Sequence, residues 1–354
     1  MRILISVGTR PNFIKVTRFK SVARALGLDL EIVHTGQHYD ENMAKVFFDQ
    51  FELRPDRFIS LKARGPSAQI GEMIMGLTDV IAEVKPDVLL TPGDVNSTLA
   101  AALAANKTGT PLAHLESGLR SNDRSMPEEI NRILVDEISD DLFVTEKSGL
   151  LNLADIVDGA NRVHFVGNTM IDTLVAYQSQ IKASPILGEY QLEEGEFVLM
   201  TMHRPATVDH LEGLQLIIDV LRLCAPRKVL FPIHPRTMAR FEKLGLKSAL
   251  MEVSNLVLTG PLGYFGFQRL VESAGFILTD SGGIQEESTF KQVPCITIRP
   301  NTERPITCEI GTNVLVESNL EAISKAIHEI DRSHAKIPDL WDGHATERVL
   351  QVYA

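Results

Sequence analysis

The chain is short of several residue types, and each shortage limits what it can be. Aromatic residues make up only 6% of the 354 residues, and the three cysteines lack the paired spacing of a zinc or disulfide site. Acidic residues outnumber basic ones, and the formal net charge of −11 argues against non-specific nucleic-acid binding. No apolar run approaches 18 residues and no cleavable leader is recognisable, so we expect a cytoplasmic protein that does not span a membrane.

What is present suits a globular α/β protein with two domains. Apolar residues make up 44% of the chain, which is enough for two hydrophobic cores. Short apolar segments alternate with helical patterns, and this alternation predicts doubly wound parallel sheets. It pauses around residues 167–185, where the polar stretch 177–184 is typical of a linker. We predict an N-terminal Rossmann-like domain over 1–170 and a second over 171–339, with a final helix at about 340–354 that packs back onto the first domain.

Polar residues or glycine turns follow most of the predicted strands. Because parallel sheets bind ligands outside the carboxyl ends of their strands, this clustering is the first functional signal. The predicted strands are 2–7, 30–34, 87–91, 111–116, 196–201, 228–233, 256–258, 276–279 and 294–298. The predicted helices include 13–26, 97–105 and 346–352.

The most distinctive stretch is residues 275–287, in which a buried strand runs through a glycine turn into a helix. Ser281 is a good helix N-cap, and Gly282 and Gly283 let a backbone or a ligand approach closely. The N–H groups and dipole of the helix N-terminus suit a phosphate, and Glu287, one turn later, is placed to accept from sugar hydroxyls. The alternative is a tight strand-to-helix turn that binds nothing.

Acid–base residues also end strands or begin helices. Asp94, Glu116 and Glu128 do so in the first half, His203 follows a strand in the second half, and Arg10 follows the first strand. Carboxylates in one sheltered site raise one another's pKa, so that one holds a proton while another acts as a base. Next to an anion site, this set suits cleavage of a sugar–phosphate bond. Taken singly, each carboxylate is more often a helix cap, and a histidine in this position more often has only a structural role.

Nine motifs then occur in the order expected of one family. They are GTRPNFIK at 8–15, TGQH at 35–38, GD at 93–94, HLESGLR at 114–120, PEEINR at 127–132, HR at 203–204, HP at 234–235, DSGGIQEE at 280–287 and TERP at 302–305. The chain resembles the bacterial-type, non-hydrolysing UDP-N-acetylglucosamine 2-epimerases, which have a glycosyltransferase-B-like fold. The resemblance extends from residue 8 to about residue 316.

The resemblance implies a fold, a reaction and an assembly. Two Rossmann-like domains would face each other across a cleft. UDP would be eliminated to leave a 2-acetamidoglucal and then re-added, which interconverts UDP-GlcNAc and UDP-ManNAc for cell-surface polysaccharide synthesis. The resemblance implies no metal and no other cofactor. The partners it implies are the UDP-sugar substrate and a second copy in a homodimer, with no nucleic acid and no membrane.

The resemblance also assigns roles by position. It implies that the catalytic residues are Asp94, Glu116, Glu128 and His203. It implies that the substrate-binding residues are Arg10, Lys15, His38, Arg132, Phe267 as a uracil contact, Ser281, Gly282, Gly283 and Glu287.

The chain departs from common family residues at several places, which leaves some alternatives open. Asn12-Phe13 replaces Glu-Ala, Ala206-Thr207 replaces Glu-Asn, and Ile306 replaces Glu. The sugar substituents at C3 and C6 and any allosteric control therefore stay open. The alternatives are an epimerase of a modified UDP-HexNAc (a uronic acid or a 2,3-diacetamido sugar), a hydrolysing 2-epimerase, a glycosyltransferase of the same fold, and a UDP-sugar-binding regulator without catalysis.

Overall fold

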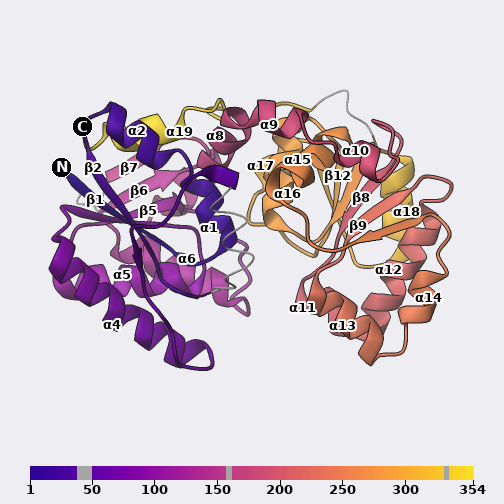
Figure 1. Cartoon of the computed structure of the whole chain (residues 1–354), viewed down its shortest axis with the longest axis horizontal. Helices are drawn as coiled ribbons and strands as arrows, with labels where there is room; N and C mark the ends of the chain where they lie inside the picture. Colours follow the sequence, from indigo (N-terminus) through magenta and orange to yellow (C-terminus); the bar gives the residue numbers. More distant parts are fainter. Residues whose placement is uncertain (38–49, 157–161, 331–334) are drawn as a thin grey trace. The chain divides into compact units, whose positions relative to one another are not determined.

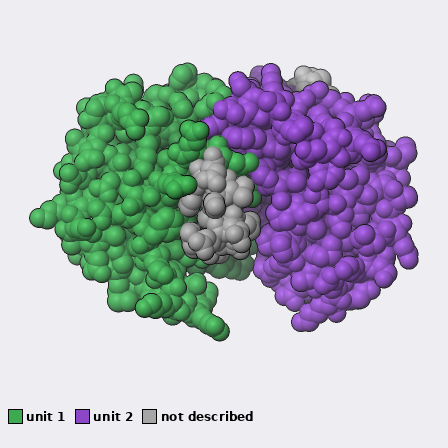
Figure 2. Space-filling model, in the orientation of Figure 1, with its two compact units in different colours: residues 1–176, 339–354 green, residues 177–338 purple. Residues whose placement is uncertain are grey.

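The structure, a computed structural model, divides into two compact units. Unit 1 comprises Met1–Ala176 with Asp339–Ala354, and unit 2 comprises Tyr177–Pro338 (Figure 2). Each unit is built around a parallel sheet (Figure 1). The described residues are 1–37, 50–156, 162–330 and 335–354.

The sheet of unit 1 has seven parallel strands among the described residues, in the order β3-β2-β1-β4-β5-β6-β7. The order reverses direction between β1 and β4, and ligands bind at such switch points in doubly wound folds. β4 and β5 are buried along their whole length, as expected of strands covered by helices on both faces. The strands are β1 Arg2–Val7, β2 Asp29–His34, β3 Arg57–Phe58, β4 Val88–Pro92, β5 Leu112–Ser117, β6 Asp141–Val144 and β7 Arg162–Phe165.

Helices complete unit 1, and one prediction about them was wrong. Residues 13–26 form two helices, α1 and α2, because the chain turns at Val16 and thereby buries both Val16 and Phe19 completely. α5 is rich in alanine, and its small side chains let it pack closely between α4 and α6. The helices are α1 Arg10–Lys15, α2 Phe19–Ala25, α4 Pro66–Val84, α5 Asn96–Thr108, α6 Pro127–Ile138, α7 Lys147–Leu153, α8 Thr169–Ala176 and α19 Ala345–Gln351.

The C-terminal segment belongs to the core of unit 1. α19 packs against α2 and α8, and Figure 1 shows it beside α2. The backbone N–H groups of Ala345 and Thr346, in its first turn, donate to the buried carboxylate of Asp172 at 3.1 and 2.6 Å. Trp341 is only 2% exposed and donates its ring N–H to the carbonyl of Thr145 at 3.0 Å. This segment therefore completes a core that begins some 300 residues earlier in the chain.

The sheet of unit 2 repeats the design with six parallel strands among the described residues, in the order β10-β9-β8-β11-β12-β13. Its order reverses between β8 and β11, which puts the end of β8 beside the glycine turn after β11. The strands are β8 Val198–Thr201, β9 Val229–Pro232, β10 Leu256–Thr259, β11 Phe276–Thr279, β12 Cys295–Ile298 and β13 Asn313–Val316.

The helices of unit 2 include one inside the predicted linker 177–184, which is a second correction. α9 forms there because Ile181 is completely buried and the side chain of Gln178 hydrogen bonds to Glu272 at 2.9 Å. The helices are α9 Gln178–Lys182, α10 Ile186–Glu189, α11 Pro205–Val208, α12 Leu211–Leu223, α13 Pro235–Lys243, α14 Lys247–Met251, α15 Tyr264–Ser273, α16 Gly282–Lys291, α17 Ile306–Glu309 and α18 Leu320–His328.

A search of the described residues finds no helix that is both long enough and apolar enough to cross a membrane. α4 has the length, at 19 residues, but it carries the charged residues Glu72, Asp79 and Glu83.

The packing of α19 generates a stability prediction. Leu350 is completely buried on this helix, so Leu350→Ala should lower the free energy of unfolding by about 2–5 kcal/mol through lost burial and a residual cavity. Urea unfolding followed by the fluorescence of Trp341, the single tryptophan, measures the change. The control is Gln351→Ala, an exposed neighbour that should change stability by less than about 0.5 kcal/mol. Equal effects of the two substitutions would contradict the packing described.

Candidate functional site

The predicted site residues gather at the switch point of each sheet. In unit 1 they form what we call the carboxylate cluster, which lies at the ends of β1, β4 and β5 and the start of α6. In unit 2 they form the glycine turn, residues 280–283 between β11 and α16, together with His203 after β8. The carboxylate cluster comprises Lys15, Asp94, Glu116, Glu128 and Arg132.

Lys15 and Glu116 form a buried ion pair in the carboxylate cluster. Lys15 Nζ donates to Glu116 Oε2, and the two side chains are 10% and 7% exposed. Both lie against Gly93, which has φ +73°; a Cβ there would sit 3.0 Å from Lys15 Nζ. Asn12, in the same helix as Lys15, donates to the carbonyl of Pro92 at 2.9 Å. The β4 turn therefore needs a glycine both for its backbone conformation and for this close approach.

The backbone of Glu116 is unusual for a residue with a side chain. Its φ is +73°, and the pairing of β5 with β6 shifts register at this point, between Leu115 and Ser117. A non-glycine residue in the left-handed region costs about 1–3 kcal/mol and is found most often at functional sites. The bulge re-aims one side chain of an otherwise regular buried strand.

Arg132 holds Asp94. Its guanidinium donates to Asp94 Oδ2 through Nη2 at 2.6 Å and Nε at 3.0 Å, and Nη1 donates to Glu129 Oε2 at 2.8 Å. Asn131 adds a bond to the backbone carbonyl of Asp94 at 2.8 Å. The N-cap of α5 is Val95, so Asp94 is not the N-cap residue of that helix.

Glu128 and Glu129 are neighbours in the first turn of α6 with different surroundings. Glu129 is 1% exposed and accepts from the backbone and hydroxyl of Ser121 at 2.8 and 2.9 Å. Glu128 is half-buried and makes no hydrogen bond or ion pair with any residue that the structure describes. The N-cap of α6 is Met126, so Glu128 does not cap it either. Of the two carboxylates, Glu128 is the one available to a ligand.

A buried network supports the carboxylate cluster from behind. His114 Nε2 donates to the carbonyl of Gly93 at 2.8 Å, and Nδ1 lies 2.6 Å from Asp136 Oδ1. Asp136 Oδ2 accepts from Arg120 at 2.6 Å and from the backbone of Gly118 at 3.1 Å. Burial acts to raise the pKa of Asp136, but His114 and Arg120 outweigh it and the net pKa is lowered. The turn that carries Asp94 is thus held by a charged network whose histidine and aspartate are completely buried.

Of the two other residues predicted for unit 1, Arg10 lies near the same switch point. Arg10 is the first residue of α1, directly after the turn that follows β1. Gln37 accepts from the backbone N–H of Ser97 at 2.7 Å and so satisfies a donor in the first turn of α5. Gly8 lies so close to Ser97 that a Cβ would sit 2.2 Å from its hydroxyl oxygen. His38 lies outside the described residues.

In unit 2, Asp280 organises the end of β8. It is completely buried and accepts from the backbone N–H groups of His203 and Arg204 at 2.9 and 2.8 Å. His203 Nδ1 lies 3.1 Å from Asp280 Oδ1, and the histidine side chain is 47% exposed. Burial acts to raise the pKa of Asp280, but His203 and the two N–H groups outweigh burial and lower it.

The glycine turn leads into the ten-residue helix α16, whose N-cap is Ser281. The side chain of Ser281 makes no capping bond, so the first N–H groups of α16 receive none from it. A Cβ on Gly282 would sit 2.6 Å from Glu303 Oε1 and 2.8 Å from Arg304 Nη1. A side chain at this position would therefore have to displace the ends of Glu303 and Arg304. Gly283 is the second helical residue.

Three arginines surround this turn. Arg304 is paired with Glu286 and Glu303, and Arg299 donates to Glu303 at 2.9 Å. Arg299 Nη1 is buried and has no hydrogen-bond partner among the described residues. Burial, followed by repulsion from Arg299, lowers the pKa of Arg204. An N–H donor left without a partner near a helix N-terminus favours an anion.

The other two residues predicted in unit 2 lie on α15 and α16. Glu287 is 6% exposed on α16. Phe267 is half-buried on α15 and packs with Leu262 against the core.

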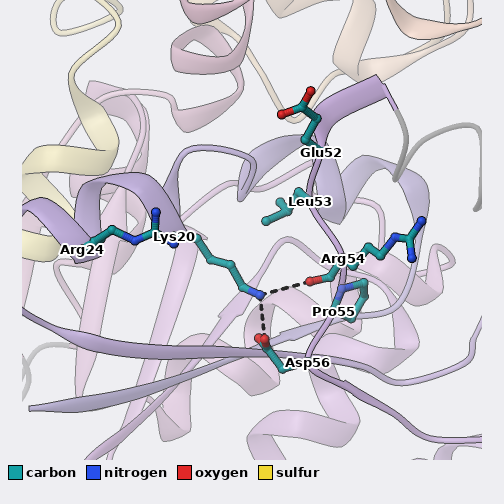
Figure 3. Close-up of a pocket in the computed structure, with 7 residues that line it drawn as sticks. All are labelled: Lys20, Arg24, Glu52, Leu53, Arg54, Pro55 and Asp56. Carbon is teal, nitrogen blue, oxygen red and sulfur yellow. Dashed lines mark hydrogen bonds and ion pairs between the residues drawn. The ribbon is translucent and has the colours of Figure 1, made fainter.

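A hollow of about 590 Å³ lies elsewhere in unit 1. Lys20 points across it to the carbonyl of Arg54 at 3.0 Å and to the carboxylate of Asp56 at 2.7 Å (Figure 3). None of the predicted site residues lines it, and this ammonium is already paired, so we do not assign it to the site. Its lining residues are Lys20, Arg24, Glu52, Leu53, Arg54, Pro55 and Asp56.

Comparison with known proteins decides the family. The sequence profile of the family described as UDP-N-acetylglucosamine 2-epimerase matches residues 20–354. The UDP-N-acetylglucosamine 2-epimerase of Methanocaldococcus jannaschii is 37% identical over 99% of this chain and 98% of its own length. The crystal structure of UDP-GlcNAc 2-epimerase from that organism, in complex with UDP-GlcNAc and UDP, has a TM-score of 0.91 at 36% identity, over 100% of this chain and 99% of that one.

The chain belongs to the UDP-N-acetylglucosamine 2-epimerase family. It is an isomerase of the non-hydrolysing type, and the resemblance inferred from its motifs is confirmed. A UDP-2,3-diacetamido-2,3-dideoxy-D-glucuronate 2-epimerase of Pseudomonas aeruginosa is 40% identical over 89% of this chain and 88% of its own length. A structure of Phytolacca americana UGT2, at 10% identity and a TM-score of 0.62, shares the glycosyltransferase-B-like fold and shows no more than that.

Sequence reasoning missed the residues that hold the epimerase site together. His114 and Glu129 lie within two of the family motifs, HLESGLR and PEEINR, and this position could have identified them as candidates. Asp136 lies four residues after Arg132 and so on the same face of α6, a spacing that could have drawn attention to it. Arg120 pairs with Asp136, and Arg132 pairs with Asp94 and Glu129.

The contrast between neighbouring glutamates generates a prediction. If Glu128 exchanges protons with the substrate, Glu128→Gln should slow epimerisation by about 10²–10⁴-fold. Its free energy of unfolding should change by less than about 0.5 kcal/mol. Glu129→Gln should instead lose about 1.5–3 kcal/mol of stability, because buried bonds to a charged group weaken, and keep most of its turnover. Urea unfolding and a proton NMR assay measure both quantities; the reverse pattern would mean the assignments are exchanged.

His34, at the end of β2, generates a pH prediction. It is 5% exposed, stacks on Phe58 with ring centroids 5.1 Å apart, and accepts from the backbone of Gly36. Burial lowers its pKa to about 4. Since the unfolded value is about 6.5, the unfolded chain binds the proton more tightly, and this contribution to stability is complete above pH 6.5 and is lost as the pH falls toward 4.

The wild-type epimerase should therefore be about 2 kcal/mol less stable at pH 5 than at pH 7 from this group alone. His34→Asn keeps a hydrogen-bond acceptor but cannot bind the proton, so its stability should fall correspondingly less over the same range. Urea unfolding at both pH values gives the comparison. Identical pH dependence in the two proteins would show that His34 does not titrate as described.

Proposed function

We propose that this chain is a UDP-N-acetylglucosamine 2-epimerase that interconverts UDP-GlcNAc and UDP-ManNAc. The observation that carries the proposal is the division of labour between the units. Unit 1 presents Asp94, Glu116 and Glu128 at one switch point, and unit 2 presents His203 beside an anion-favouring turn at another. The related M. jannaschii enzyme, whose structure contains UDP-GlcNAc and UDP, is similar over the whole chain.

The reaction proceeds by elimination and re-addition. A base removes the proton at C2 while the bond between C1 and the UDP oxygen breaks, which leaves UDP and 2-acetamidoglucal. In the reverse sense the UDP oxygen adds to C1 and a proton returns to C2 on the opposite face. No atom is gained or lost overall, so the chemistry needs only acid–base groups and a site that retains UDP.

The carboxylate cluster supplies the acid–base groups. Glu128 has no partner among the described residues and is the carboxylate best able to exchange a proton with the sugar. Asp94 is oriented by Arg132, and Glu116 by Lys15, so each carboxylate has a defined position before substrate arrives. Such pre-positioning avoids the entropic cost of orienting the groups during the reaction.

The glycine turn supplies the site that retains UDP. The first N–H groups of α16 and the cations of Arg204 and Arg299 favour the diphosphate, and His203 lies beside them. Phe267 is proposed to contact uracil, and Ser281 and Glu287 to bind the nucleotide. We further propose a cytoplasmic homodimer that supplies cell-surface polysaccharide synthesis.

A second candidate is an epimerase of a modified UDP-HexNAc. The observation that favours it is the 40% identity to the diacetamidoglucuronate 2-epimerase, close to the 37% identity to a UDP-GlcNAc epimerase. The buried Asn12, which donates to the turn after β4, differs from the common family residue at a position close to the carboxylate cluster. The carboxylates act at C2 in both reactions, so only the sugar substituents separate the two candidates.

The test is proton NMR of the wild-type enzyme with UDP-GlcNAc, UDP-GlcNAc uronic acid and the 2,3-diacetamido uronic acid, in EDTA and without acceptor. We expect UDP-GlcNAc to give UDP-ManNAc, and deuterium from D₂O to enter at C2 because elimination removes that proton. Release of free N-acetylmannosamine would indicate a hydrolysing enzyme. Turnover only of a uronic acid would favour the second candidate, and no turnover of any sugar without an acceptor would favour a glycosyltransferase.

A further inference from the structure

The side chain of Asp280 touches more of the proposed catalytic machinery than a capping role explains. One oxygen, Oδ2, accepts from the backbone of both His203 and Arg204, at 2.9 and 2.8 Å. The other, Oδ1, lies 3.1 Å from His203 Nδ1. Asp280 is completely buried, so solvent does not compete for this carboxylate, whereas the ring of His203 is 47% exposed.

The chemistry of the two partners decides which ring nitrogen carries the proton. An ionised carboxylate only accepts hydrogen bonds, so the nitrogen that faces it must carry the hydrogen. In neutral imidazole, the second nitrogen then has a free lone pair. Here the nitrogen facing Asp280 is Nδ1, which leaves Nε2 as the nitrogen able to take a proton from, or return one to, a ligand.

The surrounding charges do not offer His203 Nδ1 an equivalent acceptor. The charged groups that act on the adjacent Arg204 are Arg299, Arg304, Glu303 and Asp280, and Glu303 is already paired with Arg299 and Arg304. His234, the N-cap of α13, interacts with His203, but its Nδ1 already accepts from the backbone of Arg236 at 3.2 Å. Asp280 is therefore the acceptor that sets the orientation of the ring.

The placement rests on the sheet rather than on a loop. β8 and β11 are adjacent parallel strands, with Thr201 paired to Thr279 at their ends. The hydroxyls of this pair are 2.7 Å apart, and Thr279 also accepts from the backbone of Ser281. Asp280 follows Thr279 directly, so the same strand end fixes both the histidine and the start of the glycine turn.

We propose that Asp280 is a positioning residue that holds His203 as the Nδ1–H tautomer and presents Nε2 to the substrate. This inference rests on the proposed function, in which His203 acts at the leaving diphosphate. The new element is that Asp280, the first residue of the glycine turn, also orients the histidine. The catalytic ring and the start of the UDP site are therefore aligned by one carboxylate.

The test reads the tautomer directly. Long-range ¹H–¹⁵N NMR of wild-type chain labelled at histidine, at alkaline pH where imidazole is neutral, distinguishes Nδ1–H from Nε2–H, and His203→Gln assigns the signal. We expect Nδ1–H in the wild type. In Asp280→Asn the amide offers N–H to the ring, so we expect Nε2–H, with kcat lower by about 10²–10⁴-fold and KM changed by less than about threefold.

The outcomes separate this inference from the proposed function. An Nε2–H signal in the wild type, or an unchanged tautomer in Asp280→Asn, would overturn the positioning role even in an active epimerase. The wild-type spectrum remains decisive if Asp280→Asn fails to fold. If His203→Gln kept full epimerase activity, His203 would leave the proposed mechanism, and the wild-type tautomer would still report on Asp280.

Discussion

A buried carboxylate ties the turns together at the switch point of each sheet. In unit 1, Asp136 accepts from the side chain of His114 and from the backbone of Gly118. In unit 2, Asp280 likewise accepts from the side chain of His203 and from the backbone of Arg204. An unpaired charge in such surroundings costs several kcal/mol, so the donors cannot move away without a large penalty. The positions of the polar residues around each switch point follow from this constraint.

The sequence predicted nine of the described strands because they are short, apolar and followed by glycine or a polar residue. It did not predict β3, which has only two residues, or β6, β7 and β13, which open with the polar residues Asp141, Arg162 and Asn313. The break between α1 and α2 and the helix α9 were missed for another reason. Both are set by packing, through Val16 and Ile181, that local periodicity does not encode.

The candidate site was predictable in its membership but not in its contacts. The positions of the strand ends identified Asp94, Glu116 and His203 as candidates. The adjacent glutamates at 128 and 129, however, do not show in the sequence which of them hydrogen bonds within the protein and which is left for a ligand. Gly282 shows the same limit. A glycine after a strand suggests close approach of a ligand, but here Glu303, 21 residues later, already occupies the space that a side chain would need. Such contacts depend on tertiary structure.

The ion pair of Lys15 and Glu116 has a consequence for how such a site can change over generations. With both side chains almost enclosed, replacing one partner leaves the other charge uncompensated, at a cost of about 3–5 kcal/mol. That cost is a large part of the stability of a typical domain. Neither residue can be substituted alone without this loss of stability. A protein that evolves without the ion pair has to replace both residues, either in one step or through a poorly folded intermediate. The pair is therefore inherited as a unit.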